Sequence, residues 1–475
     1  MQRDNTQIAV LGVGTTGLAV VRHLRSKGLA PVVLDTRSKA AALPTYAVDA
    51  LPDELLGLLI LWEVVDWPQE TLAQVAALVA SPGVPLNHSV IKGARLANVT
   101  IESDIDLFFA SVDQPVLAVT GTNGKSTVVE LAAHILNAQG IRCGLGGNIG
   151  TPALDLLAGD AQFDAFVLEL SSFQLERSSL LTLTSAVVLN LSEDHLDHHE
   201  TMAAYRAAKQ RIYARAQTVV VNPDLVSQFE LGTANRIYFS PALLSDSCCV
   251  GAACNPDSES GEQWIYAGRW PVCAVDSLPL TGKHNVTNVC AALALVWPVL
   301  ANHAVDWRRV GESLKAFRGL DHRFQEVARI AGVTYINDSK ATNVGATEAA
   351  LNAFGFDKSL ILIAGGDAKG ADLTVLEKSF RRCVKHLFTL GKDGHSLHEL
   401  AKLWKVPSEF VLTLEAAVQR AANLAVTGDT ILLSPACASL DMFANYAERG
   451  RRFAAAVGGL SRDGLDAALP QREGS

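Results

Sequence analysis

The chain has 475 residues, of which 49% are hydrophobic and 19% charged. A chain of this length and composition buries sizeable cores, and at about 150 residues a domain it predicts roughly three domains. Its formal net charge of −9, without a concentrated basic tract, argues against a sequence-independent nucleic-acid binder. Eight cysteines are scattered along it without a Cys-x-x-Cys or the spacing of a zinc site, which is typical of a reducing compartment.

The first residues predict neither secretion nor a membrane anchor. The stretch MQRDNTQ is polar and lacks the apolar core of a signal peptide. The most apolar early run, LLGLLILWEVV, is too short to span a bilayer. We therefore expect a cytoplasmic protein that binds no membrane.

A glycine pattern opens the first block of the chain. The stretch IAVLGVGTTG, residues 8–17, is an apolar run that breaks into Gly-x-Gly-x-x-Gly before a helical pattern, and Asp35 closes the next apolar run, PVVLD. Such glycines allow a tight strand-to-helix turn, the helix N-terminus attracts phosphate, and the carboxylate suits a ribose hydroxyl. Taken alone, the pattern predicts a nicotinamide-dependent oxidoreductase, but similar turns hold other nucleotides or none.

Three blocks of the chain repeat a short apolar run, a glycine-bearing loop and an amphipathic helix. This predicts an α/β fold throughout, with mainly parallel sheets covered by helices. We expect domains at residues 1–108, 109–319 and 320–475, with Gly319 in a hinge, a helix at 285–300 and an irregular excursion at 245–265. The strands are expected at 8–12, 31–35, 76–83, 115–121, 165–170, 185–191, 218–222, 333–338, 360–367, 386–391 and 429–436.

A second glycine loop outranks the first as a chemical signal. At residues 116–127 the sequence VLAVTGTNGKST gives a strand, a loop and the start of a helix, with Val119 where the full Walker pattern has glycine. The backbone N–H groups of such a loop surround phosphates, Lys125 reaches the β/γ oxygens, and the hydroxyl of Ser126 binds Mg²⁺. The alternative is a glycine turn with a solvated lysine. The expected ATP-binding residues of this loop are Gly121, Thr122, Asn123, Gly124, Lys125, Ser126 and Thr127.

Two later apolar runs end in groups suited to metal. Glu169 closes one run, where a strand parallel to that of the phosphate loop delivers a ligand for nucleotide-linked Mg²⁺, and His195 follows the other. The cluster of His195, Asp197, His198 and His199 suggests zinc instead, but the adjacent His198 and His199 do not easily share one ligand geometry. We interpret these two histidines as the solvated start of a helix.

Nine motifs in chain order resemble those of the Mur ligase family: GTNGKST, GGNIGTPAL, LELSSFQLE, NLSEDHLDHH, YRAAKQRIY, GKHNVTN, DHRFQ, NDSKATN and LLSPACASLD. The resemblance extends from Gly12 to about Phe453 and is greatest for the branch that adds D-glutamate to UDP-N-acetylmuramoyl-L-alanine. It implies three domains, which bind the UDP substrate, ATP, and the amino acid in that order. It also implies that ATP activates the alanyl carboxylate as an acyl phosphate, which the amine of D-glutamate then attacks.

The resemblance implies a catalytic set of Lys125, Glu169, His195, Lys209 and Lys340. It also implies two Mg²⁺ ions, whose charge offsets the repulsion between the anions that react. Periodicity alone places Lys209 on a solvated helix face. By resemblance it is instead carbamylated, which turns a cation into an anionic oxygen ligand. The implied metal ligands are Ser126, Glu169, His195 and the carbamate of Lys209.

Three further sets of residues follow from the resemblance. The base and ribose of ATP are assigned to Asn285, Asn288, Arg323 and Asp338. The amino-acid substrate is assigned to Thr342, Lys369, Ser439, Leu440 and Tyr446. The UDP substrate is assigned to Gly14, Thr15, Thr16, Asp35, Thr36, Arg37, Ser81, Gly83, Asn148 and His195.

Two positions depart from the family pattern. Asp321 stands where proline is expected, and Tyr446 where phenylalanine is expected. The first touches the hinge and the second adds a hydroxyl to the wall of the amino-acid pocket. Neither removes a charge that the mechanism needs.

Several alternatives remain open from the sequence. Another Mur-type or folylpolyglutamate-type ligase would use a different amino acid, although the latter lacks a full N-terminal nucleotide-binding block. A nicotinamide-dependent oxidoreductase would leave Lys125, Glu169, His195 and Lys340 without a purpose. A regulatory P-loop ATPase without ligase activity is the third alternative. We expect a monomer that binds no nucleic acid.

Overall fold

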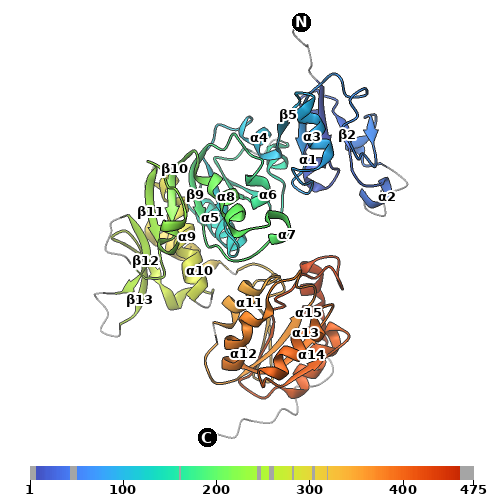
Figure 1. Cartoon of the computed structure of the whole chain (residues 1–475). Helices are drawn as coiled ribbons and strands as arrows, with labels where there is room; N and C mark the ends of the chain where they lie inside the picture. The colour runs from blue at the N-terminus through green and yellow to red at the C-terminus, as the bar shows by residue number, and fades with distance from the viewer. Residues whose placement is uncertain are drawn as a thin grey trace. The chain divides into compact units, whose positions relative to one another are not determined.

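Three sheets and the helices that cover them form a mixed α/β fold (Figure 1). The chain divides into two compact units: residues 1–191, 198–278 and 287–317 form one, and residues 192–197, 279–286 and 318–475 form the other. The computed structural model describes residues 7–42, 51–159, 162–242, 248–255, 261–280, 283–301, 305–317, 319–352 and 354–460.

The first sheet has five parallel strands in the order β3-β2-β1-β4-β5. In β1, Ala9 and Leu11 face one side and Val10 faces the other, and all three are buried. A parallel sheet that is apolar on both faces needs a helix on each. Helix α3 (Ser89–Leu96) covers the face of Leu11, and α1 (Thr15–Ser26) covers that of Val10. The strands are β1 (Gln7–Leu11), β2 (Val32–Leu34), β3 (Ile60–Leu61), β4 (Val75–Ala80) and β5 (Thr100–Glu102).

The central sheet has nine strands in the order β14-β13-β12-β11-β10-β9-β6-β8-β7. It is parallel from β7 to β12, and β12, β13 and β14 pair antiparallel at one edge. The strands are β6 (Val116–Thr120), β7 (Cys143–Gly147), β8 (Ala165–Glu169), β9 (Leu183–Val188), β10 (Ala216–Val221), β11 (Asn235–Phe239), β12 (Cys249–Cys254), β13 (Gln263–Ala267) and β14 (Trp270–Ala274).

The predicted irregular excursion at residues 245–265 is wrong where the structure describes it. Residues 249–254 and 263–265 belong to β12 and β13, because Val250 and Ile265 alternate into the core while small neighbours allow close pairing. The polar residues between the two strands hid this alternation in the sequence. Residues 245–247 and 256–260 lie outside the described part of the chain.

One continuous core joins the first and central sheets within the first unit. Phe108, on α4 (Asp104–Phe109), packs edge-on against Phe166 of β8, with ring centroids 5.2 Å apart. The Asp106 carboxylate accepts hydrogen bonds from the backbone N–H groups of Ser179 at 2.7 Å and Leu180 at 2.9 Å. Both glycine loops therefore belong to the same compact unit.

The helices of the central sheet include the segments that carry the candidate site. No helix in the described ranges is long and apolar enough to cross a membrane. The expected helix at 285–300 is confirmed as α9. The helices are α5 (Lys125–Ala138), α6 (Ser172–Leu175), α7 (Leu196–His199), α8 (Met202–Gln210), α9 (Lys283–Leu300) and α10 (Trp307–Ala316).

The third sheet has the order β15-β16-β20-β17-β18-β19, parallel except for β15 against β16. Helices α14 and α15 pack on one face, and α11, α12 and α13 pack on the other. The strands are β15 (Gln325–Ile330), β16 (Val333–Asn337), β17 (Leu360–Gly365), β18 (Val384–Leu390), β19 (Ser408–Phe410) and β20 (Thr430–Leu433). The helices are α11 (Val344–Leu351), α12 (Glu377–Cys383), α13 (Gly394–Leu403), α14 (Leu414–Leu424) and α15 (Tyr446–Leu460).

The first glycine loop generates a stability prediction. A Cβ atom at Gly17 would lie 1.7 Å from the carbonyl oxygen of Gly12, so Gly17→Ala forces the helix away from β1. We expect this variant to lose about 1–3 kcal/mol of unfolding free energy and to speed amide hydrogen exchange in β1. At Gly14 nothing lies within 4 Å of the added atom, so Gly14→Ala should change the stability by less than about 0.5 kcal/mol. Equal stability of the two variants would contradict the close approach.

Candidate active site

The loop between β6 and α5 is held in shape by asparagines. Gly124, the N-cap of α5, has a φ of 84°, and a Cβ there would lie 2.6 Å from Oδ1 of Asn288. Beyond the end of β9, Asn190 accepts a hydrogen bond from the N–H of Asn123 at 2.8 Å and donates to its carbonyl at 2.9 Å. The amides at the start of α5 are therefore preorganised for a phosphate.

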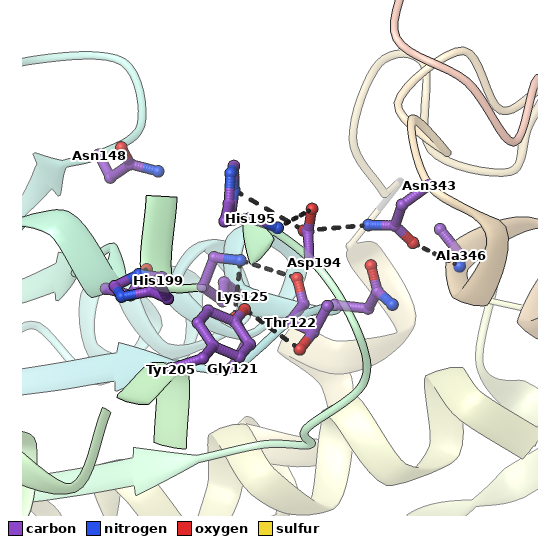
Figure 2. A network of polar contacts seen from close by, with 12 residues as sticks. Gly121, Thr122, Lys125, Asn148, Asp194, His195, His199, Tyr205, Asn343 and Ala346 are labelled. Carbon is purple, nitrogen blue, oxygen red and sulfur yellow. Dashed lines mark hydrogen bonds and ion pairs between the residues drawn. The ribbon is translucent and has the colours of Figure 1, made fainter. Parts of the chain in front are cut away.

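Lys125 folds back over this loop (Figure 2). Its Nζ donates to the carbonyl oxygens of Gly121 at 2.9 Å and Thr122 at 2.8 Å. An ammonium group held by loop carbonyls can exchange them for phosphate oxygens without leaving the loop. This placement suits the phosphate-binding role better than that of a lysine pointing into solvent.

Glu169 lies at the carboxyl end of β8, in register with Val119 of β6. It is buried, and its carboxylate accepts hydrogen bonds from Ser126 Oγ at 2.5 Å and from Asn148 Nδ2 at 2.9 Å. Ser126 and Glu169 thus place two oxygen atoms side by side at the start of α5, and Mg²⁺ prefers oxygen ligands. These residues fit a magnesium ion.

Lys209 is buried, with 1% of its surface exposed, so the solvated face predicted from periodicity alone is wrong. Its Nζ donates to the carbonyl of Gly121 at 2.9 Å and to Thr120 Oγ1 at 3.3 Å. The ammonium also lies 4.5 Å from the ring centroid of Tyr205, whose hydroxyl is 3.3 Å from Thr122 Oγ1. Helix α8 therefore delivers Lys209 to the back of the phosphate loop.

The interpretation of the two adjacent histidines as solvated is also wrong. His199 is buried, with Nε2 2.9 Å from Ser172 Oγ, and His198 Nε2 lies 2.9 Å from a carboxylate oxygen of Glu176. Helix α6 packs close to α8 and brings Ser172 and Glu176 to these rings. A sequence pattern over six residues contains no trace of this neighbour.

Eight of the ten predicted UDP residues lie at the carboxyl ends of the strands of the first sheet, whereas Asn148 follows β7 of the central sheet and His195 lies in the second unit. Asp35 is buried, and its carboxylate accepts hydrogen bonds from the N–H of Val13 at 2.9 Å and from the backbone and guanidinium of Arg37. Burial opposes ionisation, but these bonds hold the pKa of Asp35 below its usual value. Ser81 Oγ donates to the carbonyl of Gly12 at 3.3 Å. Asp35 therefore orders the loops around the expected pocket.

In the second unit, the predicted ATP residue Asp338 is buried. Its carboxylate accepts hydrogen bonds from Ser434 Oγ at 2.9 Å and the N–H of Phe324 at 3.1 Å. Burial raises its pKa to about 7, against the opposing effect of these bonds and of Arg323. The side chain is thus close to its titration point at neutral pH.

The predicted Lys340 lies against an aromatic face. Its Nζ is 3.7 Å from the ring centroid of Tyr446, a cation–π contact that any aromatic at this position would provide. Arg449, buried on α15, donates to Ser339 Oγ at 3.0 Å and to the carbonyl of Cys437 at 3.2 Å. Arg449 therefore joins the segment that carries Lys340 to the loop that precedes Ser439.

Beyond the ends of β17, β18 and β20, hydrogen bonds join the loops that carry Lys369, Ser439 and Leu440. Asp367 accepts from the N–H of Lys369 at 2.9 Å and exchanges backbone hydrogen bonds with Ala438. Leu440 is exposed, with 69% of its surface accessible, although it is apolar. Lys369 and Leu440 therefore lie on two loops that pair with one another, and both are exposed.

His195 sits in a strained turn, with a φ of 53°. Its N–H donates to Asp194 Oδ1 at 3.0 Å, and the other carboxylate oxygen of Asp194 accepts from Asn343 Nδ2 at 3.3 Å (Figure 2). Asn343 also caps α11, accepting from the N–H of Ala346 at 2.9 Å. These contacts orient the histidine predicted to bind metal.

The sequence analysis missed several residues that shape the site. These residues all lie outside the two glycine loops: Asn190, Asp194, Tyr205 and Arg449. Asn190, Asp194 and Tyr205 fall inside the motifs NLSEDHLDHH and YRAAKQRIY. Asn190 and Asp194 also have a positional signal, because they follow a strand whose parallel neighbour ends in the phosphate loop. Tyr205 and Arg449 lie inside helices and carry no such signal.

The raised pKa of Asp338 generates a prediction about stability. The folded protein keeps on this carboxyl a proton that the unfolded chain, with a pKa near 3.8, has already released. Its contribution is fully present below pH 3.8 and is lost as the pH rises through about 7. Urea unfolding of Asp338→Asn across this window should therefore show a smaller fall in stability with rising pH than the unchanged protein. Asp372→Asn, at an exposed carboxyl with a lowered pKa, should keep the original slope; parallel slopes for all three proteins would refute the assignment.

Comparison with known proteins agrees with this geometry in all three sheets. The family model described as the Mur ligase MurD-like N-terminal domain matches residues 6–103. The Mur ligase middle domain matches residues 119–296, and the Mur ligase glutamate ligase domain matches residues 322–437. The predicted α/β fold with three domains is thereby confirmed, while the exact boundaries stay predictions.

Curated relatives match nearly the whole chain. The UDP-N-acetylmuramoylalanine–D-glutamate ligase of Methylococcus capsulatus is 40% identical, covering 96% of this chain and 95% of its own. The enzyme of the same name from Vibrio vulnificus is 39% identical, covering 95% of this chain and 98% of its own.

Solved structures share the fold at lower identity. The UDP-N-acetylmuramate-alanine ligase of Thermotoga maritima aligns with a TM-score of 0.59 at 20% identity, covering 95% of this chain and 99% of that one. A pseudomurein peptide ligase type C from Methanothermus fervidus aligns with a TM-score of 0.58 at 20% identity, covering 96% and 100%. With relatives near 40% identity over almost its full length, the chain belongs to the Mur ligase family.

Proposed function

We propose that this protein joins D-glutamate to UDP-N-acetylmuramoyl-L-alanine by an amide bond, with conversion of ATP to ADP and phosphate, in peptidoglycan precursor synthesis. The observation that carries the proposal is the near-complete match to relatives named for this activity. The phosphate loop beside Ser126 and Glu169 supports it, because it suits nucleotide and magnesium rather than a nicotinamide ring. We do not retain the oxidoreductase alternative.

The reaction proceeds in two steps. An oxygen of the alanyl carboxylate attacks the γ-phosphorus of ATP, the bond from phosphorus to the β-bridging oxygen breaks, and ADP leaves. The amine of D-glutamate then attacks the carbonyl carbon of the acyl phosphate, loses a proton, and phosphate leaves as the amide bond forms. Both steps bring anions together, so the protein has to supply fixed positive charge.

Within this reaction we assign phosphate binding to Lys125 and Lys340. Lys125 is held over the loop by two carbonyls, and Lys340 is held against Tyr446, so both ammonium groups are positioned before substrate arrives. Asn285, Asn288, Arg323 and Asp338 are assigned to the base and ribose. Asp338 suits a ribose hydroxyl because a carboxyl oxygen can accept a hydrogen bond from it.

Magnesium would be held by Ser126, Glu169, His195 and a carbamate on Lys209, and when bound it would neutralise charge on the transferring phosphoryl group. The burial of Lys209 supports the modification, since an ammonium in this place costs desolvation. Reaction of the neutral amine with carbon dioxide gives a carbamate and a proton. The product presents two oxygens at the back of the loop.

The same reasoning applies to the UDP substrate and to D-glutamate, which are assigned to the first and third domains. The first glycine loop, with Gly14, Thr15 and Thr16, would bind the diphosphate, because amides at the start of α1 suit any pyrophosphate. Asp35, Thr36 and Arg37 would lie near the uridine, and Ser81 and Gly83 would close the other side of that pocket. Asn148 would lie nearer the sugar. Lys369 would pair with the side-chain carboxylate of D-glutamate, while Thr342, Ser439, Leu440 and Tyr446 form the rest of that pocket.

The amino acid is tested by measuring phosphate release from ATP in the presence of UDP-N-acetylmuramoyl-L-alanine. We expect release with D-glutamate and little with L-lysine, meso-diaminopimelate or D-alanyl-D-alanine. Without the UDP substrate, D-glutamate alone should give only background. Equal release with any of the other amino acids would overturn the assignment to this branch and leave the ligase family unaffected.

The carbamate is tested by Lys209→Ala. Loss of a metal ligand should lower kcat by more than the roughly 10–100-fold that is lost with residues that only hydrogen-bond to metal ligands. Added formate or acetate should restore part of the activity, because a small carboxylate can take the place of the missing oxygens. The matched control is Lys402→Ala, at an exposed lysine of α13, which should leave kcat unchanged. Failure of every small carboxylate to rescue a folded Lys209→Ala protein would count against a carbamate.

A further inference from the structure

The side chains of His198, His199 and Glu176 converge on one point beside helices α6 and α7. One nitrogen from each of His198 and His199 and a carboxylate oxygen of Glu176 all lie within 4.8 Å of one another. His198 Nε2 is 2.9 Å from Glu176 Oε1, and His199 Nδ1 is 3.8 Å from Glu176 Oε2. The two ring planes meet at 83°, with centroids 4.7 Å apart. Adjacent histidines therefore do direct nitrogens to one carboxylate.

The surroundings hold both rings in place. Phe173 packs edge-on against His198 at 4.5 Å and stacks on His199 at 5.6 Å between centroids, and Tyr205 lies 5.3 Å from His199 on another side. Ser172 Oγ is 2.9 Å from Nε2 of His199, which leaves Nδ1 as the nitrogen turned toward Glu176. A hydrogen bond at one ring nitrogen that orients the other is the usual arrangement around a metal-binding histidine.

A nearby arginine lies close to the carboxylate of Glu176 but donates its hydrogen bonds elsewhere. Arg177 Nη2 is 3.7 Å from Glu176 Oε1, but it donates its hydrogen bonds to the carbonyl oxygens of Pro82, at 3.2 Å, and Val84. The guanidinium thus contributes charge at a distance. The carboxylate oxygens of Glu176 that point toward the histidines can therefore ligate a metal ion.

We propose that Glu176, His198 and His199 form a binding site for a divalent transition metal of the zinc type, separate from the magnesium ligands of the ligase reaction. Two imidazoles and one carboxylate are a donor set that Zn²⁺ prefers and Mg²⁺ does not. A small inward movement of the three side chains brings nitrogen and oxygen to bonding distance of about 2.0–2.2 Å. Water supplies the remaining coordination.

The consequence of binding is a link between two short helices. Glu176 follows α6, and both histidines end α7, so an ion here ties α6 to α7. Helix α7 begins at the residue after His195, the proposed magnesium ligand. Zinc at this site therefore restrains the segment that carries His195, without taking any ligand of the reaction itself.

The test is titration of Zn²⁺ into the metal-free full-length protein by calorimetry, with excess Mg²⁺ present to occupy the magnesium site. We expect one zinc ion to bind, and X-ray absorption at the zinc edge to show scattering from two imidazoles. Zinc held only by the magnesium ligands would show one imidazole, from His195, and would refute the proposal. Absence of binding would refute it as well.

The matched variant is His198→Arg. Arginine can donate a hydrogen bond to Glu176 but cannot ligate a metal, so the thermal midpoint without metal should stay near that of the unchanged protein. Its zinc affinity should fall at least tenfold, and the rise in thermal midpoint that zinc gives the unchanged protein should disappear. The control is His398→Ala, on α13, which should keep full zinc affinity. Equal affinity in His198→Arg would overturn the site, and this result is independent of the proposed ligase activity.

Discussion

Parallel pairing of β6 with β8 and β9 is the constraint on which the phosphate site depends. Parallel strands end at one edge of a sheet, so the glycine loop after β6, Glu169 at the end of β8, and Asn190 after β9 meet there. None of these residues needs a long or flexible side chain to reach the others. The sheet thus brings together groups that are about twenty to seventy positions apart in sequence, a consequence of strand order rather than of local pattern.

Burial of charged groups gives this site its chemical character. Glu169 and Lys209 lie under the loop, each with hydrogen-bonding partners, and a buried charge is tolerated only when such partners are in place. The same reasoning applies in the second unit, where Arg449 is satisfied by loop carbonyls and Asp338 by a hydroxyl and an amide. These arrangements hold charge in fixed positions, which lowers the reorganisation needed when phosphates bind.

A glycine turn at the start of a helix occurs twice in the first unit, each time with different side chains around it. At α1 the turn faces Asp35 and Arg37, which bind one another, whereas at α5 it faces a lysine, a serine and a carboxylate. The amides suit phosphate in both places. The side chains around them separate a site that only binds a diphosphate from one suited to phosphoryl transfer.

The sequence by itself determined the α/β class, most strands near the glycine loops, and the positions of Lys125, Ser126 and Glu169, because each depends on a strand, a turn and a helix within about thirty residues. It missed β12 and β13, whose apolar alternation is short and interrupted by polar residues. Only the tertiary structure decided that Lys209 and His199 are buried and that Glu176 meets two histidines. A helix pattern shows which residues share a face, but what covers that face comes from segments distant in sequence. The phosphate loop covers Lys209, and α6 contacts His199.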